Sequence, residues 1–118
     1  MRRAARTDTN HANVTAALTA IGAFVLDIHA VPGALDLLVA YRGALTLLEI
    51  KDGQKTESRL KATAAERATL REALHRQAPA WIVWSEHEAM VMVGAIDDAA
   101  ARERVIDRTH EEASFHGV

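Results

Sequence analysis

The stretch that decides the fold is residues 34–53, which read ALDLLVAYRGALTLLEIKDG. It contains two apolar runs, residues 35–41 and 44–50, separated only by Arg42 and Gly43. A two-residue connection between apolar runs is typical of an antiparallel β-hairpin, and its length fixes which residues lie opposite each other. The stretch therefore predicts two paired strands at the centre of the fold.

The register of this hairpin brings two acids together. Asp36 is expected opposite Glu49, and because side chains alternate along a strand, both lie on the same face as Lys51. Two like charges directly opposite each other destabilise a sheet, and a cation between them would remove that penalty. Carboxylate oxygens suit Mg²⁺ or Mn²⁺, and Lys51 beside such a metal would steady an anionic transition state. The alternative is an ion pair of Lys51 with both acids.

The rest of the chain predicts further helices and strands. Apolar residues recur at helical spacing, and two of the helical segments open on a capping box, Thr63 to Glu66 and Ser85 to Glu88. We expect helices over 10–21, 63–77, 85–93 and 97–109, and further strands over 24–29 and 80–84. The order α-β-β-β-α-β-α-α predicts an α/β (α+β) fold with a mixed central sheet flanked by helices.

Length and composition are typical of one folded domain. The chain has 118 residues, of which 49% are hydrophobic, so it can bury one core. It has no cysteine, which excludes disulfides and thiolate zinc sites. No apolar run approaches the roughly 20 residues that span a bilayer, so no membrane partner is expected. The basic start is not followed by an apolar segment, so we expect a cytoplasmic protein rather than a secreted one.

The charges are distributed unevenly, although the net charge is only −2. Residues 42–76 contain eight Lys and Arg against five acids, whereas residues 85–118 contain three Arg against eight acids. A basic segment around the predicted carboxylate pair favours a phosphodiester substrate. The alternative is a set of solvated helix faces, because isolated surface charges are weak evidence.

The segment that carries Asp36, Glu49 and Lys51 resembles the PD-(D/E)xK nuclease superfamily. It is most similar to the small phage and bacterial members near the VRR-NUC and Holliday-junction resolvase-like nucleases. Residues 33–55, GALDLLVAYRGALTLLEIKDGQK, are similar to that family's G-x-PDLLV-x-YRG…LLE-x-K-DG block. Asp36 and Glu49-Ile50-Lys51 match its motif. The resemblance covers about residues 8–93 of a single domain and leaves 95–118 as an acidic C-terminal helical extension.

The resemblance implies a restriction-endonuclease-like core and a Mg²⁺-dependent DNA endonuclease, with branched or phage DNA as the candidate substrate. Asp36, Glu49 and the backbone carbonyl of Ile50 would hold the metal, and Lys51 would position water or offset charge on phosphorus. Basic side chains near the motif would contact DNA phosphates, namely Arg42, Lys55, Arg59 and Lys61. A solvated loop is the alternative for these residues.

Three departures from the family pattern leave other functions open. Leu35 replaces the proline that usually precedes the motif Asp, Asn13 stands where many relatives have a first-helix Glu, and Glu66 stands where a Gln is usual. Asn13, Glu66 and the nearby His11 are candidate accessory residues. The alternatives are a catalytically weakened nuclease-fold protein that binds DNA or regulates, and a protein-interaction module with a structural Asp/Glu/Lys salt bridge.

Two further expectations concern residues outside the motif. Asp27 either ligates metal or, as the plainer alternative, faces solvent or pairs with a basic side chain, and His29 is expected in a turn or at an edge. A homodimer is expected because small relatives often pair and because the chain has apolar residues beyond the needs of one small core, Trp81, Ile82, Trp84, Met90, Met92, Val105 and Ile106. The acidic tail is expected as a peripheral or interface helix that supplies no catalytic group.

Overall fold

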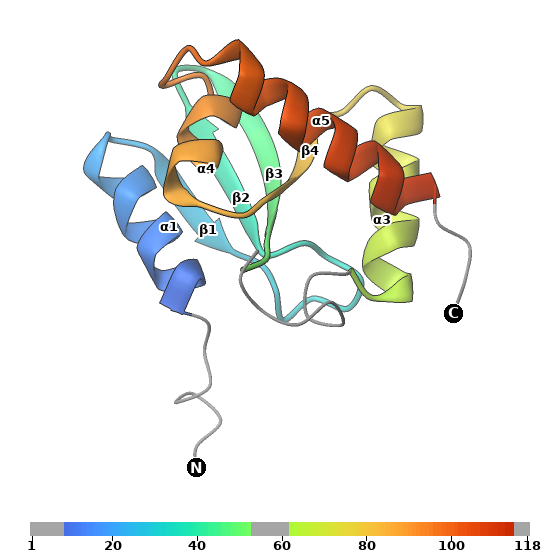
Figure 1. The fold of residues 1–118 in the computed structure, drawn as a ribbon. Helices are drawn as coiled ribbons and strands as arrows, with labels where there is room; N and C mark the ends of the chain where they lie inside the picture. The colour runs from blue at the N-terminus through green and yellow to red at the C-terminus, as the bar shows by residue number, and fades with distance from the viewer. Residues whose placement is uncertain (1–8, 53–61, 115–118) are drawn as a thin grey trace.

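A computed structural model describes residues 9–52 and 62–114 (Figure 1). The order of its elements is the order predicted from the sequence. They are α1 (Thr9–Ala20), β1 (Phe24–Asp27), β2 (Leu37–Tyr41), β3 (Ala44–Ile50), α3 (Ala64–His75), β4 (Ala80–Val83), α4 (Glu86–Met92) and α5 (Ala99–Ser114). No helix in these two ranges is both long and apolar enough to cross a bilayer.

The described strands form one four-stranded sheet in the order β1-β2-β3-β4. β1 and β3 both pair antiparallel with β2, and β4 pairs parallel with β3, so the sheet is mixed and the coarse fold class is confirmed. Tyr41 pairs with Ala44, as the two-residue turn predicts. Arg42 and Gly43 in that turn have φ angles of 52° and 84°, the left-handed conformations that such a turn requires.

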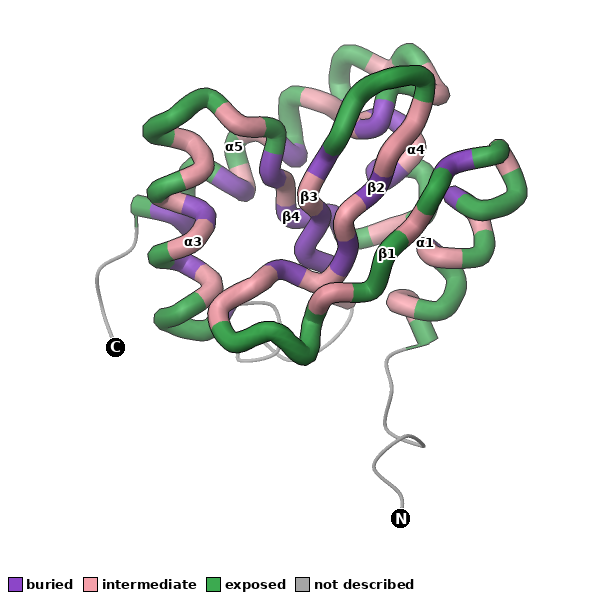
Figure 2. Tube along the Cα trace, turned by 180° about the vertical axis from the view of Figure 1, so that it is seen from behind, coloured by how far each residue is buried: buried purple, intermediate pink, exposed green. Residues whose placement is uncertain are grey.

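Helices cover the two faces of the sheet unequally. α1 and α4 pack on one face, where a first core forms around Val14, Leu18 and the inward residues of β2 and β3. α3 packs on the other face, beside β4, where Leu70 and Ile82 belong to a second, smaller core. Figure 2 shows the sheet from the second side, with α3 beside it and α1 behind β1. The half of this face formed by β1 and β2 therefore has no helix over it within the described residues.

α5 closes the outer edge of β4. The Thr109 hydroxyl accepts a hydrogen bond from the Ile82 N–H at 2.9 Å, and Arg108 donates to the Ile82 carbonyl at 3.0 Å. Val105 is fully buried in the first core and Ala113 belongs to the second. The helix continues to Ser114 because Ala101, Val105, Thr109 and Ala113 recur every four residues on its buried side. It is part of the core and not a peripheral helix as expected.

The apolar residues that suggested a dimer surface are used mainly inside the protein. Ile82 and Val105 are buried, and Trp81, Met90 and Met92 pack against the first core. That choice of surface was wrong, because closeness in sequence does not tell which way side chains point once a strand and a helix pack face to face. Of this set Trp84 remains exposed, whereas the more exposed apolar side chains, Phe24, Leu26, Val31 and Leu45, lie elsewhere.

Candidate active site

The polar candidates of β1, β2 and β3 lie at one end of the sheet. β2 runs antiparallel to both neighbours, so its first residues lie beside the last residues of β1 and β3. The Asp36 N–H donates to the Leu48 carbonyl at 3.0 Å, and the Asp36 carbonyl accepts from the Ile28 N–H at 2.9 Å. These bonds continue the ladder one residue beyond β2 and place Asp36 level with Glu49, as the sequence predicts.

The Asp36 carboxylate is fixed against β3. Its Oδ2 accepts a hydrogen bond from the Ile50 N–H at 2.7 Å. Burial raises the pKa of Asp36, and the Ile50 N–H opposes this rise only in part. The prediction that the Ile50 carbonyl is a metal ligand stays a prediction, whereas the Ile50 amide already orients the acid that precedes β2.

Glu49 is the least satisfied polar side chain of the site. The residue is 1% exposed, and its Oε2 lies 3.2 Å from the Lys51 ammonium. Its Oε1 is buried and has no hydrogen-bond partner among the described residues. A buried carboxylate oxygen without a donor is costly, so Glu49 Oε1 is open to a partner beyond the described residues.

Burial also gives Glu49 an unusual acidity. Burial first, and then the Asp36 and Glu66 carboxylates, raise the pKa of Glu49 to about 9. The protonated form of Glu49 is therefore favoured more than in an ordinary glutamate, although Lys51 lies beside it. The site has three carboxyl groups and one ammonium, so it gathers negative charge that a divalent cation would offset.

Lys51 is held as a cation. Burial alone would lower the pKa of its ammonium, but the Glu49 and Glu66 carboxylates outweigh burial and raise the pKa. Glu66 Oε1 lies 3.9 Å from the Lys51 Nζ. A charged donor is thus fixed next to the carboxyl pair.

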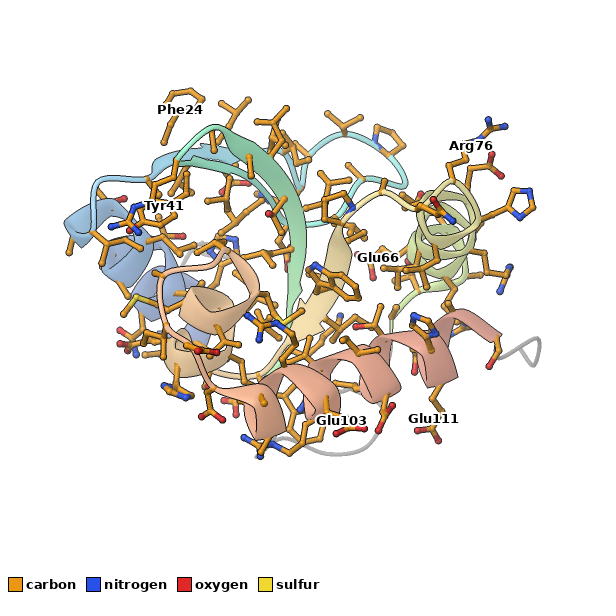
Figure 3. The ribbon with its side chains drawn as sticks, turned by 90° about the horizontal axis from the view of Figure 1, so that it is seen from above. Phe24, Tyr41, Glu66, Arg76, Glu103 and Glu111 are labelled. Carbon is orange, nitrogen blue, oxygen red and sulfur yellow. The ribbon has the colours of Figure 1, made fainter. Side chains whose placement is uncertain are left out.

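Glu66 reaches Lys51 because it also caps α3. Its carboxylate accepts from the Thr63 N–H at 2.9 Å, and the Thr63 hydroxyl accepts from the Glu66 N–H at 3.1 Å, which completes the predicted capping box. Figure 3 shows Glu66 between α3 and the sheet. Of the three accessory candidates, this one contacts a motif residue directly.

The first helix reaches the site through a different residue from the one expected. Asn13 is exposed, so the structure does not bring it to the carboxyl pair. Asn10 instead donates to the Lys51 carbonyl at 3.0 Å and to the Trp84 carbonyl at 2.8 Å, which ties the start of α1 to the ends of β3 and β4. The sequence did not predict this role for Asn10, because the two carbonyls lie 41 and 74 residues away along the chain.

His11, Asp27 and His29 form a second group at the same end of the sheet. His29 Nδ1 lies 2.5 Å from Asp27 Oδ1, and His11 Nε2 lies 4.0 Å from Asp27 Oδ2. The hydrogen bond lowers the pKa of Asp27 and raises that of His29. β1 ends at Asp27, earlier than expected, because this carboxylate also accepts from the His29 N–H at 3.1 Å and forms a turn.

Of the four DNA-binding candidates, Arg42 alone lies within the described residues. Lys55, Arg59 and Lys61 lie outside the described residues. Arg42 is exposed in the hairpin turn, at the opposite end of β2 from Asp36, with its guanidinium 4.9 Å from the centre of the Tyr41 ring. In a single copy, Arg42 therefore does not flank the carboxyl pair.

Asp36 and Glu49 fit one kind of metal site. No three described His, Asp or Glu side chains are placed to hold an ion together. Mg²⁺ does not need such a cage, since it commonly binds through one or two carboxylates and keeps several waters. The unpartnered Glu49 Oε1 and the oriented Asp36 carboxylate match that requirement.

Comparison of the chain with protein-family models, with curated proteins and with solved structures finds no match. What the structure itself shows is a mixed sheet flanked by helices, with the buried Glu49, the half-buried Asp36 and a lysine at one end. The class of protein is therefore inferred from the residues and their geometry.

Proposed function

We propose that the protein is a Mg²⁺-dependent DNA endonuclease of the PD-(D/E)xK type, with a restriction-endonuclease-like core. The observation that carries this proposal is Glu49, a buried carboxyl group next to Asp36 and Lys51 whose Oε1 has no hydrogen-bond partner among the described residues. A purely structural ion pair is expected to satisfy both oxygens of a buried carboxylate, because an unpaired oxygen destabilises the fold.

Asp36, Glu49 and Lys51 have different roles in the proposed reaction. Asp36, oriented by the Ile50 N–H, and Glu49 would hold Mg²⁺, which when bound supplies a Lewis acid for the phosphate and for the attacking water. Glu49 would give up its proton as the cation binds. The Lys51 ammonium would orient the attacking water or offset negative charge that develops on the phosphoryl oxygens.

DNA in a branched or phage-derived form is the proposed substrate, and the cytoplasm is the proposed location. Support comes from the sequence between Asp52 and Ala62, which contains Lys55, Arg59 and Lys61. This segment leaves from the end of β3 and returns at the start of α3, so both of its ends adjoin the site. We also propose a homodimer, since two copies would offer one site to each strand of a duplex.

A nuclease-fold protein that binds DNA without cutting is the second candidate. The exposed Asn13 favours it, because the first helix then supplies no carboxylate in place of the usual Glu. The third candidate, an interaction module, rests on the 3.2 Å pair of Lys51 and Glu49. That ion pair does not account for Glu49 Oε1, which has no hydrogen-bond partner among the described residues.

A cleavage assay separates the three candidates. Linear duplex, single-stranded and four-way-junction DNA would be incubated with Mg²⁺, Mn²⁺ or EDTA. The proposal expects metal-dependent cleavage that Glu49→Gln removes and that Glu103→Gln, an exposed acid on α5 labelled in Figure 3, preserves. DNA binding without cleavage would support the second candidate, the nuclease-fold protein that binds DNA. The absence of both binding and cleavage would support the third candidate, the interaction module.

A further inference from the structure

One face of the sheet leaves large apolar side chains in solvent. Phe24, Leu26 and Leu45 are 63%, 44% and 60% exposed. The pairing of the strands places them in two rows on one face, Phe24 level with Leu45 and Leu26 level with the half-buried Leu38 and Leu47. We call this surface, formed by Phe24, Leu26, Leu38, Leu45 and Leu47, the open face.

The described helices leave the open face uncovered. α1 and α4 pack on the opposite side of the sheet, and α3 packs over β4. Figure 2 looks onto this side, and in Figure 3 Phe24 points away from α1, α4 and α5.

The size of the open face fits a second protein surface. Its side chains present roughly 400 Å² of apolar surface, which is within the range of the largest patch on a typical monomer and is often functional. A standard interface covers about 800 Å² on each partner, and rather more than half of it is apolar. The open face would therefore supply most of the apolar centre of such an interface, and none of its five side chains carries a charge that burial would strip of water.

The charges at the two ends of the open face favour a second copy as the occupant. Arg42 is exposed at the hairpin end, and the half-buried Asp36 lies at the other end. A two-fold axis across the strands would lay the two sheets antiparallel and direct Arg42 of each copy toward the acidic end of the other. An apolar surface of this kind can pack against the same surface of a second copy, and two-fold pairing is the commonest assembly.

We propose that two copies of the chain dimerise through the open face, with their β1–β2–β3 strands packed face to face. This proposal names the surface of the homodimer proposed above and does not require DNA cleavage. It also gives Arg42 a place near the carboxyl pair, in the partner subunit rather than in its own. A dimer would protect surface that would otherwise make the monomer prone to association with other apolar surfaces.

The test is the mass of the full chain in solution. Sedimentation equilibrium at micromolar concentration in EDTA should give twice the 12.8 kDa of one chain. Leu45→Lys should weaken the dimer by about 10²-fold or more, because each interface would bury two unpaired ammonium groups. Phe24→Lys should do the same, and Ala16→Lys, which adds the same charge on the exposed side of α1, should not.

Folding is checked on the same samples. Because Leu45 is 60% exposed, its replacement should leave the far-ultraviolet circular dichroism and the cooperative thermal transition of the protein in place. A monomeric wild type at 100 µM, a concentration on the order of a weak dimer's Kd, would overturn the proposal. A Leu45→Lys variant that stays folded and dimeric would overturn it too. Either outcome leaves the proposed hydrolysis untouched, since no cleavage is measured.

Discussion

Glu49 and Glu88 are both buried carboxyl groups near the ends of neighbouring strands, and they differ in their partners. Glu88 Oε1 accepts from the Trp84 N–H and from Arg108, both at 2.7 Å, and its Oε2 accepts from Arg108 at 3.0 Å. Glu49 has Lys51 on one oxygen and no described partner on the other. Both oxygens of Glu88 therefore accept hydrogen bonds within the chain, whereas Glu49 Oε1 has no donor among the described residues.

The acidities of the two groups follow from these partners. Burial alone would raise the pKa of Glu88, but the Arg108 fork and the Trp84 N–H outweigh burial and lower it. Burial and two neighbouring acids raise the pKa of Glu49 to about 9. Burial by itself therefore does not decide the acidity of a carboxyl group, because its hydrogen-bond donors and neighbouring charges also count.

The largest expected effect is on stability and falls on Glu88. Glu88→Ala should lower the free energy of unfolding by about 3 kcal/mol, because it leaves the Arg108 guanidinium buried without its partner. Urea denaturation would measure this loss. Glu86→Ala, an exposed acid in the same helix, is the matched control and should change stability little. Equal losses in the two variants would remove the structural role given to Glu88.

The next effect is on catalysis and falls on Lys51. Lys51→Ala should lower the cleavage rate by about 10²-fold or more, as expected on losing one fixed charge from the reacting centre. DNA affinity, measured by fluorescence anisotropy, should change much less. If the variant instead loses its thermal transition, Lys51 serves the fold and the ion-pair interpretation gains support.

A smaller effect is on the pH dependence of stability. In EDTA the folded chain keeps a proton on Glu49 that the unfolded chain, with an ordinary pKa near 4.5, has already lost. The contribution of this proton to the free energy of unfolding is therefore fully present below pH 4.5, and it is lost as the pH rises through 9. Between pH 7 and 9 the wild type should lose about 2 kcal/mol relative to Glu49→Gln. Parallel curves for the two proteins would contradict the raised pKa.

The smallest expected effect comes from Glu66→Gln. This change removes one of the negative charges that raise the pKa of Glu49, while a glutamine at the same position still accepts from the Thr63 N–H. The fall in stability with pH should then end at a lower pH than in the wild type. Thermal denaturation across a pH series in EDTA would show it, and an unchanged midpoint would mean that Glu66 acts on Lys51 alone.

The sequence predicted the features that depend on local geometry. Arg42-Gly43 sets the hairpin register, which placed Asp36 level with Glu49, and the Thr63 to Glu66 spacing marked the start of α3. Ser85 caps α4 as predicted, but the Glu88 side chain bonds Trp84 and Arg108 instead of returning to the cap. A capping pattern cannot show that a partner 20 residues away competes for the same carboxylate.

The features that the sequence did not predict depend on packing between distant elements. Asn10 finds its acceptors at the ends of two strands, and the open face is exposed because α3 packs over β4 rather than over β1 and β2. Periodicity shows that Phe24, Leu26 and Leu45 are apolar and alternate, but it does not show which face a helix covers.

The most direct test of the proposed metal site at Asp36 and Glu49 is calorimetric titration of the EDTA-stripped protein with Mn²⁺, in two buffers of different ionisation enthalpy. We expect one site, with proton release as the cation displaces the Glu49 proton. Asp36→Ala and Glu49→Gln should remove the site, and Glu103→Gln should keep it. Identical Mn²⁺ binding by the wild type and Asp36→Ala, or no binding by either, would contradict the metal site on which the proposed function rests.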